Sequence, residues 1–370
     1  MQVTIKKTYK IKKINLYIVT YFGLFLLHYY TDFNFEITFS LWILFGMFGY
    51  IVLYEDVKKH RNLMIILLGV DVVAFINIII NHNHSPFNAF ILPVSQMFGL
   101  YLYEQKKNLK SLVNFIYLVM IYMLIYELVV PKTLANEWLG DWYTYFSAHM
   151  GGNTISIFLL LFLIIDIIYR KENNMSINYI AIFASLFMAY YGGGTGGVLT
   201  ITLLFLGLFG MKWKKDKLSF PKILFLIFCG ISVISILGVW NRLITVLTDS
   251  NSRFWIWEHY FECATNSLKE FIVGGDVSQI AFLDMQRNMH NTFVNWHYYY
   301  GLIPLLFFII SVIITMWRSF KYKEYTVFIF LCIVFIRAFL DETTFCFMPI
   351  WTYAMLNMND IKLARRGDRY

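Results

Sequence analysis

The stretch that decides the fold runs from Asn251 to Pro304 and reads NSRFWIWEHYFECATNSLKEFIVGGDVSQIAFLDMQRNMHNTFVNWHYYYGLIP. It ends the longest polar interruption in an otherwise apolar chain, and a new apolar run begins at its carboxyl end. Beside that run it gathers Arg253, Arg287, His290 and Asn291. When a membrane protein keeps its connections short and lengthens one of them, the long connection commonly carries the function.

The composition of the whole chain indicates a membrane protein. Of its 370 residues, 59% are hydrophobic and only 15% are charged, and the mean hydropathy is +0.59. Soluble domains are about half apolar and about a quarter charged. The net charge of +8 would suggest nucleic acid as a partner of a soluble protein, but here membrane topology explains it. The four cysteines form no CxxC pair, so we expect neither a zinc site nor a disulfide framework.

Apolar runs along the chain predict an all-α polytopic membrane protein with roughly 12 transmembrane helices, because about 20 apolar residues cross the hydrocarbon core. Residues 1–370 are predicted to form a single integral membrane domain. The first span follows a basic patch and lacks a small-residue cleavage site, so we expect it to be retained. The predicted spans lie at 14–30, 37–54, 63–80, 87–103, 112–130, 153–169, 177–191, 198–211, 223–239, 293–316, 326–340 and 345–358.

The distribution of lysine and arginine predicts the orientation of these spans. With a cytoplasmic amino terminus and alternating spans, the cytoplasmic segments carry 25 basic residues and the outer segments carry five, while Arg337 lies within a span. Basic residues collect on the cytoplasmic side of membrane proteins. Both termini of this multi-pass membrane protein are therefore predicted to be cytoplasmic.

This orientation makes residues 240–292 a long extracytoplasmic loop. Within it, Phe254 to Leu268 is periodically apolar and rich in tryptophan and tyrosine. Such a composition favours a helix that lies in the interface between the lipid and water. A second, shorter outer segment is predicted at residues 131–152.

Arg253 opens the periodic stretch on the side where basic residues are scarce. A guanidinium is a permanently charged, planar fork of donors that suits a diphosphate or a carboxylate. The alternatives are a contact with lipid headgroups or an ion pair with Glu258 or Glu262. Arg287 and Arg242, in the same loop, are weaker candidates for the same role.

His290 lies in the sequence MHNTF, directly before a predicted span. Histidine is the side chain best suited to exchange a proton near neutral pH. The alternative is a hydrogen-bonded structural histidine, and His297 competes for the catalytic role. The two histidines are not spaced like a metal site with a third ligand.

Two further features at the predicted outer side are candidates for ligand contacts. The glycine-rich residues 192–197 read GGGTGG and predict a short turn, which either cradles an anion with its free N–H groups or allows close helix packing. Arg337 and Asp341 share a helix face at four-residue spacing, and Glu342 follows them. These residues form a structural ion pair or line a cavity.

Two more carboxylates lie within predicted spans. Asp71 is in the middle of its span, where an ionisable residue lines a cavity or a proton path. Asp166 lies close to the cytoplasmic end of its span and reaches the interface.

The motifs of the carboxyl-terminal half resemble the O-antigen ligase and polymerase superfamily of membrane glycosyltransferases (Wzy and WaaL types). The resembling features are Arg253 followed by WIW, Gly274-Gly275, His290-Asn291, Gly301 with an apolar run, and Glu342 after a late span. The resemblance extends over about residues 188–357, and the amino-terminal half is similar only in its hydropathy.

The resemblance implies a C-type glycosyltransferase fold and a Wzy-like polysaccharide polymerase. Such an enzyme joins undecaprenyl-diphosphate-linked repeat units of a capsule, exopolysaccharide or O-antigen at the outer face of the bacterial cytoplasmic (inner) membrane. Its partners are the lipid-linked glycan donor and acceptor, membrane lipids and, as an optional further partner, a chain-length regulator. No cofactor, metal or nucleic acid is implied. The implied catalytic residues are Arg253 and His290, and the implied substrate-binding residues are Arg287, Asn291, Trp257, Arg337, Glu342, Gly193 and Gly194.

The chain departs from this family at the glycine turn. Relatives commonly carry Ser-Arg before these glycines, so Arg287, Arg337 or Arg242 takes over the missing charge, or the turn only packs. Two rival functions remain at this point: a ligase of the same superfamily, and a flippase or transporter. A transporter predicts internal repeats and broken spans in matching halves, and the sequence shows neither.

Overall fold

The computed structural model describes residues 35–81, 86–129, 152–191, 194–213, 253–278 and 289–366. Within these ranges the chain is largely helical and forms no strand, which confirms the prediction of an all-α protein. Ten of the twelve predicted spans lie on these residues to within one position, and helices occupy most of each. The other two predicted spans, 14–30 and 223–239, lie outside the described residues.

The helices fall into three stretches of the sequence. The first contains α2 (Phe35–Met47), α3 (Gly49–Val52), α4 (Tyr54–Lys59), α5 (Arg61–Asn81), the 3-10 helix η1 (Pro86–Phe90) and α6 (Ile91–Glu104). The second contains α7 (Lys110–Val129), α8 (Gly152–Glu172), α9 (Tyr179–Tyr191) and α10 (Thr195–Trp213). The third contains α13 (Arg253–Thr265), α14 (Leu268–Val273), α16 (Thr292–Tyr300), α17 (Leu302–Lys321), α18 (Tyr325–Leu340) and α19 (Thr344–Arg366).

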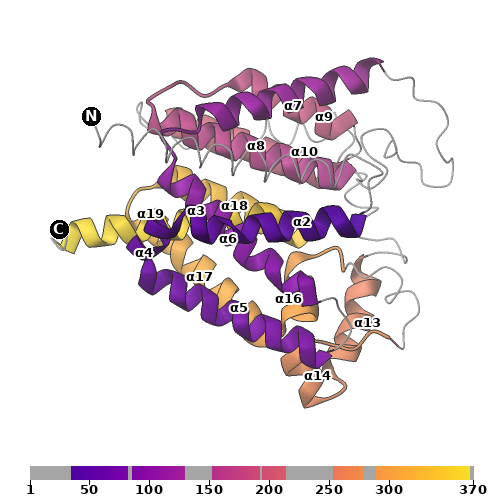
Figure 1. Cartoon of the computed structure of the whole chain (residues 1–370). Coiled ribbons are helices and arrows are strands. Elements are labelled where there is room, and N and C mark those ends of the chain that lie inside the picture. The colour runs from indigo at the N-terminus through magenta and orange to yellow at the C-terminus, as the bar shows by residue number, and fades with distance from the viewer. Residues whose placement is uncertain are drawn as a thin grey trace.

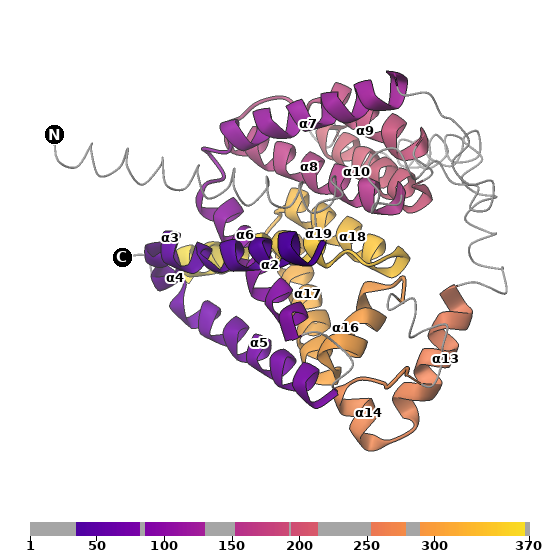
Figure 2. The ribbon, with the colours of Figure 1, turned by 45° about the vertical axis from the view of Figure 1, so that its right-hand side comes forward.

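The long helices run side by side in a bundle (Figure 1). Helices α7 to α10 form one side, α5 and α17 form the other, and α6, α18 and α19 lie between them (Figures 1 and 2). The short helices α13 and α14 cover one end of the bundle next to α16. The predicted loop helix therefore exists and lies at a bundle end.

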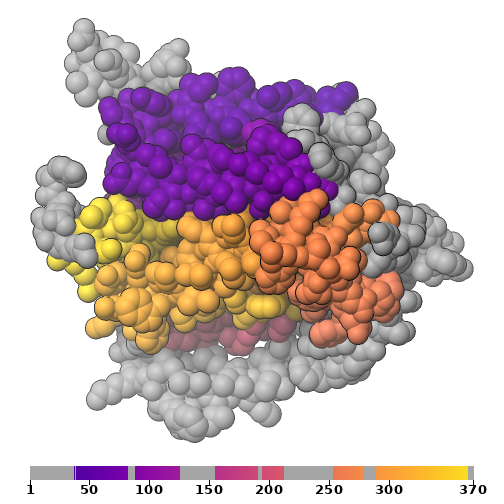
Figure 3. All heavy atoms as spheres, turned by 90° about the horizontal axis from the view of Figure 1, so that it is seen from below, coloured from indigo at the N-terminus to yellow at the C-terminus, as the bar shows by residue number. Residues whose placement is uncertain are grey.

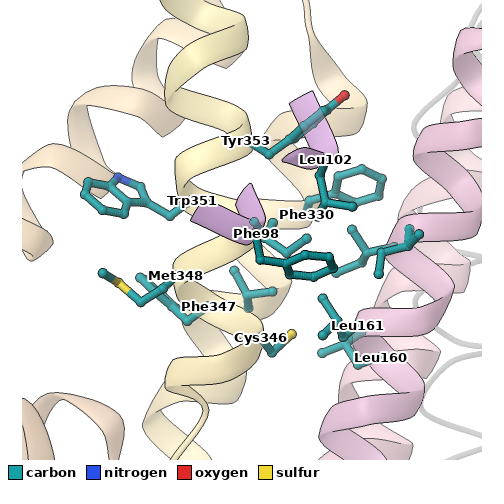
Figure 4. Close-up of a cluster of buried hydrophobic side chains, with 14 of the residues drawn as sticks. Phe98, Leu102, Leu160, Leu161, Phe330, Cys346, Phe347, Met348, Trp351 and Tyr353 are labelled. Carbon is teal, nitrogen blue, oxygen red and sulfur yellow. The ribbon is translucent and has the colours of Figure 1, made fainter. Parts of the chain in front are cut away.

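The centre of the bundle is a close packing of α6 against α19. A Cβ atom added to Gly99 would lie 2.6 Å from the carbonyl oxygen of Pro349, so the two backbones touch there. Large apolar side chains from α6, α8, α18 and α19 fill the surrounding space, including Phe98, Leu161, Phe330 and Phe347 (Figure 4). Burying a side chain of this size contributes about 1.5–3 kcal/mol.

Polar contacts tie the helix connections together at the end of the bundle that is opposite α13 and α14. Glu104 accepts from Lys59 Nζ at 2.8 Å, and its Oε1 also lies 2.8 Å from His60 Nε2. Lys171 Nζ donates to Glu324 at 2.7 Å. The short connections after α4, α6, α8 and α17 thus meet at one end, which we call the basic end. The end that carries α13, α14 and residues 341–343 is called the site end.

Two of the described helices, α5 and α17, are long and apolar enough to cross a membrane, judged by length and composition. Both leave apolar side chains exposed, and they lie next to each other on one face of the molecule (Figure 3). The exposed side chains of α5 include Ile65, Ile66, Leu68, Val72, Ile76, Ile79 and Ile80, and those of α17 include Ile303, Leu306, Ile310, Ile313 and Ile314. A face of this kind suits contact with lipid tails.

Two predicted spans are interrupted. Residues 37–54 are divided among α2, α3 and the first residue of α4, with turns at Phe48 and Leu53. Residues 293–316 form two helices, α16 and α17, which meet at Gly301 with a φ of 80°. A Cβ atom there would lie 2.5 Å from Asn77 Nδ2 and 2.6 Å from the carbonyl oxygen of Ile272. The break also frees the carbonyl of Tyr300, which accepts from Asn77 Nδ2 at 2.7 Å. Apolar composition continues across the break, so hydropathy alone predicts one helix.

Candidate functional site

Asp341 lies at the site end and is approached by three basic side chains: Arg337 one helical turn before it, and Arg253 and His290 from distant parts of the sequence. Its Oδ2 atom lies 3.9 Å from Arg253 Nη2 and 3.8 Å from Arg337 Nη2. Its Oδ1 atom lies 3.6 Å from His290 Nδ1. We call these four residues the Asp341 cluster. The structure thus brings together Arg253, His290 and Arg337, which the sequence predicts as site residues.

The members of the Asp341 cluster differ in their access to solvent. The exposed fractions of the side chains are 1% for Arg337, 9% for Asp341, 19% for Arg253 and 30% for His290. Arg337 is therefore the buried base of the cluster, whereas Arg253 and His290 form its accessible rim. A ligand that approaches the cluster meets Arg253 and His290 first.

Arg337 connects the cluster to α8 and α10. Its Nη2 donates to Ser156 Oγ in α8 at 3.3 Å. A Cβ atom added to Gly196, in the first turn of α10, would lie 2.7 Å from Arg337 Nη1. The amino-terminal end of a helix carries a partial positive charge, so Arg337 and α10 together make this region electropositive. Asp341 is the neighbouring carboxylate that compensates part of this charge.

The backbone at His290 is held in an unusual conformation. Its φ is 48°, in the left-handed region that few residues other than glycine adopt. Met289, directly before it, donates its N–H to Asn295 Oδ1 at 2.9 Å and accepts at its carbonyl from Trp257 Nε1 at 2.7 Å. Such strain persists where the surroundings fix it, and it concentrates at functional sites.

Glu342 is the second carboxyl group at the site end. It accepts from Asn295 Nδ2 at 2.7 Å and from the N–H of Thr344 at 2.9 Å, and the Thr344 hydroxyl also donates to it. Burial raises the pKa of Glu342 above its ordinary value, although these hydrogen bonds oppose the shift. Burial thus moves the titration of Glu342 to higher pH than that of an exposed glutamic acid.

The pKa of Asp341 is shifted in the opposite direction to that of Glu342. Burial alone would raise its pKa, but the adjacent His290 and the charges of Arg337 and Arg253 outweigh burial and hold the pKa below its ordinary value. Two neighbouring carboxyl groups thus have different protonation preferences, which is an arrangement typical of reactive sites.

Two of the predicted substrate-binding residues have structural contacts in this arrangement. Asn291 is buried and caps α16, because its side-chain oxygen accepts from the N–H groups of Phe293 and Val294 at 2.9 and 3.2 Å. Trp257 donates to the backbone beside His290, as described above. Their assignment to substrate binding stays a prediction.

The glycine turn is described from Gly194 onwards. The N–H of Gly194 donates to the carbonyl of Ala189 at 2.8 Å, and its own carbonyl accepts from Gly197 and Val198. These bonds join α9 to α10 and engage the N–H of Gly194 within the turn. Three other residues that the sequence suggests for contacts with the substrate lie outside the described residues: Gly193, Arg287 and Arg242.

His297 is held in a network that fixes the helices of the site end. Its Nε2 lies 2.9 Å from the carbonyl oxygen of Phe271, so Nε2 carries the proton and donates it. Its Nδ1 therefore accepts from the Tyr260 hydroxyl, at 2.5 Å. The same hydroxyl accepts from the N–H of Gly275 at 3.3 Å. Both ring nitrogens of His297 are thus engaged in joining α13, α14 and α16.

Sequence reasoning missed the central position of Asp341 and the roles of Asn295 and Tyr260. The four-residue spacing from Arg337 was the one signal for Asp341. Asn295 and Tyr260 lie in apolar, aromatic stretches that resemble core sequence. Their contacts depend on how α13 and α16 meet, and no local pattern encodes that.

Within the described ranges, no group of three or more histidine, cysteine and acidic residues is placed to hold a metal ion. No known protein-family model matches the sequence, and no curated protein matches it significantly. The class is therefore defined by the molecule itself: an all-helical bundle with exposed apolar faces and a cationic cluster at one end.

Proposed function

We propose that this protein is a membrane glycosyltransferase that polymerises undecaprenyl-diphosphate-linked oligosaccharide repeat units on the outer face of the bacterial cytoplasmic membrane. In this proposal the chain crosses the membrane roughly 12 times, both termini are cytoplasmic, and the site end faces outwards. The apolar faces of α5 and α17 support membrane insertion. The grouping of basic connections at the basic end supports the orientation.

The Asp341 cluster is the observation that carries the proposal. Two arginines and one histidine face a single carboxylate. The cluster therefore has excess positive charge, which suits an anionic group such as a diphosphate. Arg253 is the more accessible arginine, and its guanidinium can present two parallel donors to the phosphate oxygens.

The proposed reaction forms one bond and breaks one. A hydroxyl oxygen of the acceptor glycan bonds to the anomeric carbon of the donor sugar, and the bond between that carbon and the diphosphate oxygen breaks. The leaving diphosphate gains negative charge, which Arg253 stabilises. The acceptor hydroxyl loses its proton to His290.

Asp341 prepares His290 for this role. The carboxylate faces Nδ1 and favours the tautomer with its proton there, which leaves the Nε2 lone pair available as a base. Their distance of 3.6 Å is beyond a good hydrogen bond, and catalytic contacts of this kind commonly shorten when the substrate binds. Arg337 holds Asp341 from the buried side.

The proposal is tested by Arg253→Ala in cells that depend on this chain for their polysaccharide. Polymer should disappear and single repeat units should accumulate on the lipid carrier, at unchanged protein level. Arg253→Lys should recover only part of the polymer, because an ammonium lacks the fork of donors. Lys269→Ala, an exposed cation on α14, is the matched control and should behave as wild type. Normal polymer length in Arg253→Ala would exclude the role of Arg253.

The orientation is tested by cysteine labelling in a cysteine-free background. An impermeant maleimide added to intact cells should label Ser278→Cys at the site end and should leave Asn174→Cys at the basic end unlabelled. Both positions are exposed, so a difference reports the side of the membrane. Labelling of Asn174→Cys alone would invert the proposed topology.

A further inference from the structure

A cavity of about 200 Å³ lies between α2, α3, α5, η1 and α6, and no residue of the Asp341 cluster lines it. It is open on one side, and its lining is almost entirely apolar. Leu68 and Val72 at its rim are about half exposed, so the opening belongs to the apolar outer face of α5. The residues around it are Met47, Tyr50, Leu68, Asp71, Val72, Phe75, Ala89, Phe90 and Pro93.

Asp71 is the one charged residue in this lining. Its residue exposure is 6%, and its Oδ1 accepts from Gln96 Nε2 at 2.9 Å. Its Oδ2 is buried and has no hydrogen-bond partner among the described residues, and the same holds for Gln96 Oε1. Burying such acceptors without a donor costs about 1–3 kcal/mol each. Two neighbouring acceptor oxygens therefore lack donors beside an apolar cavity.

The position of Asp71 within α5 restricts the kind of molecule that can reach it. It is ten residues from the first residue of a 21-residue helix, so it lies about 15 Å from either end at 1.5 Å per residue. In the proposed membrane orientation this is the middle of the hydrocarbon layer. A ligand that arrives laterally at this depth must be soluble in lipid.

We propose that this cavity is a binding site for a lipid-soluble primary amine, whose protonated head group donates to Asp71 Oδ2 while its apolar body fills the cavity. An ammonium group has three donors and one positive charge, which match a carboxylate with a free oxygen and a second acceptor nearby. Its charge also compensates the buried carboxylate, which no basic residue of the lining does. The site is separate from the Asp341 cluster; its depth rests on the proposed membrane orientation but not on the proposed glycosyltransferase activity.

The test measures thermal unfolding of the full-length protein in phosphatidylcholine nanodiscs at increasing concentrations of decylamine. Decan-1-ol and decyltrimethylammonium are compared with it, since the first lacks the charge and the second lacks N–H donors. Decylamine should raise Tm, with a half-maximal concentration at least about tenfold below those of the other two, as expected for a hydrogen bond to a charged group.

Three variants test whether decylamine raises Tm by binding in the cavity. Asp71→Asn keeps the shape of the side chain and should abolish the advantage of decylamine. Ala89→Leu fills the cavity while Asp71 remains, and it should also abolish the effect. Gly69→Ala, on the same helix but with open space around it, should bind as wild type does. Wild-type binding in either Asp71→Asn or Ala89→Leu, or equal binding of decyltrimethylammonium, would overturn the proposal.

Discussion

The two oxygens of Asp341 face different partners: Oδ1 lies 3.6 Å from His290 Nδ1, while Oδ2 lies 3.8 Å from Arg337 Nη2. The N–H of Glu342 also donates to Oδ1 at 2.9 Å, which fixes the orientation of the carboxylate. A single side chain thereby links the buried arginine to the accessible histidine. In the proposed reaction this link sets the tautomer of His290 and balances the charge of Arg337.

Replacing Asp341 with asparagine should therefore affect stability and activity together. The substitution keeps the size of the side chain but leaves the buried Arg337 without its carboxylate, a change that costs about 3–5 kcal/mol for a buried pair. We expect a clearly lower Tm in nanodiscs and at least about 10²-fold less polymer per folded molecule, because His290 loses its orientation. Glu55→Gln removes an exposed acid at the basic end and is the control. A variant with wild-type Tm would contradict the buried ion pair.

The two histidines should respond differently to substitution. His290→Asn keeps a residue type that tolerates the left-handed conformation but removes the base. It should preserve Tm and lose about 10²–10⁴-fold in turnover. His297→Gln breaks the contacts with Tyr260 and Phe271, so it should lower Tm, while the folded fraction keeps most of its activity.

These outcomes are measured by sizing lipid-linked glycans at matched amounts of folded protein. If His297→Gln is stable and inactive while His290→Asn remains active, the base has been assigned to the wrong histidine. Activity in both variants would mean that the reaction depends on stabilisation of the leaving group alone.

Hydropathy was sufficient to predict the helices but not the way in which they meet. The apolar runs at 63–80 and 153–169 lie within α5 and α8, because length and composition alone determine such helices. The break at Gly301 was missed, since its cause is the close approach of Asn77 and Ile272 from other helices. Long-range contacts of this kind leave no local pattern.

The candidate site was predictable only for residues that stand out in the local sequence, and not for residues whose role depends on long-range contacts. Arg253 and His290 stand out because polar residues are rare next to apolar runs, and the structure places both beside Asp341. Asn295 does not stand out, because its partners Met289 and Glu342 lie six and 47 residues away. Only the meeting of α16 with the turn before α19 brings these groups together.

The break between α16 and α17 predicts a strong effect of Gly301→Ala. The added methyl group meets Asn77 and a backbone carbonyl at about 2.5 Å, and the φ of 80° disfavours any residue with a Cβ. We expect a large drop in Tm or failure to accumulate in the membrane. Gly69→Ala is the matched control, because nothing lies within 4 Å of its added methyl group. A wild-type Tm for Gly301→Ala would show that the two helices are continuous in the membrane.

The raised pKa of Glu342 predicts how stability depends on pH. In the unfolded chain a glutamic acid has a pKa of about 4.3, whereas burial raises that of Glu342 in the folded protein. Between these two values the folded state holds a proton that the unfolded state has released. The free energy of unfolding therefore falls as pH rises through this window. The lowered pKa of Asp341 has the opposite effect: it makes the free energy of unfolding rise with pH, but only below about pH 3.9.

Glu342→Gln cannot titrate, so its Tm should fall less steeply than that of wild type as pH rises from about 4.5 to neutrality. Its Tm at low pH should still be lower, because an amide cannot accept from both Asn295 and Thr344 as the carboxyl group does. The measurement is the difference in Tm between the variant and wild type across this range, with Glu55→Gln as an exposed control. A constant difference at every pH would mean that Glu342 does not titrate between these limits and that its pKa is close to the ordinary value. A difference that shrinks as pH rises would show a proton held by buried Glu342 next to the ionised Asp341.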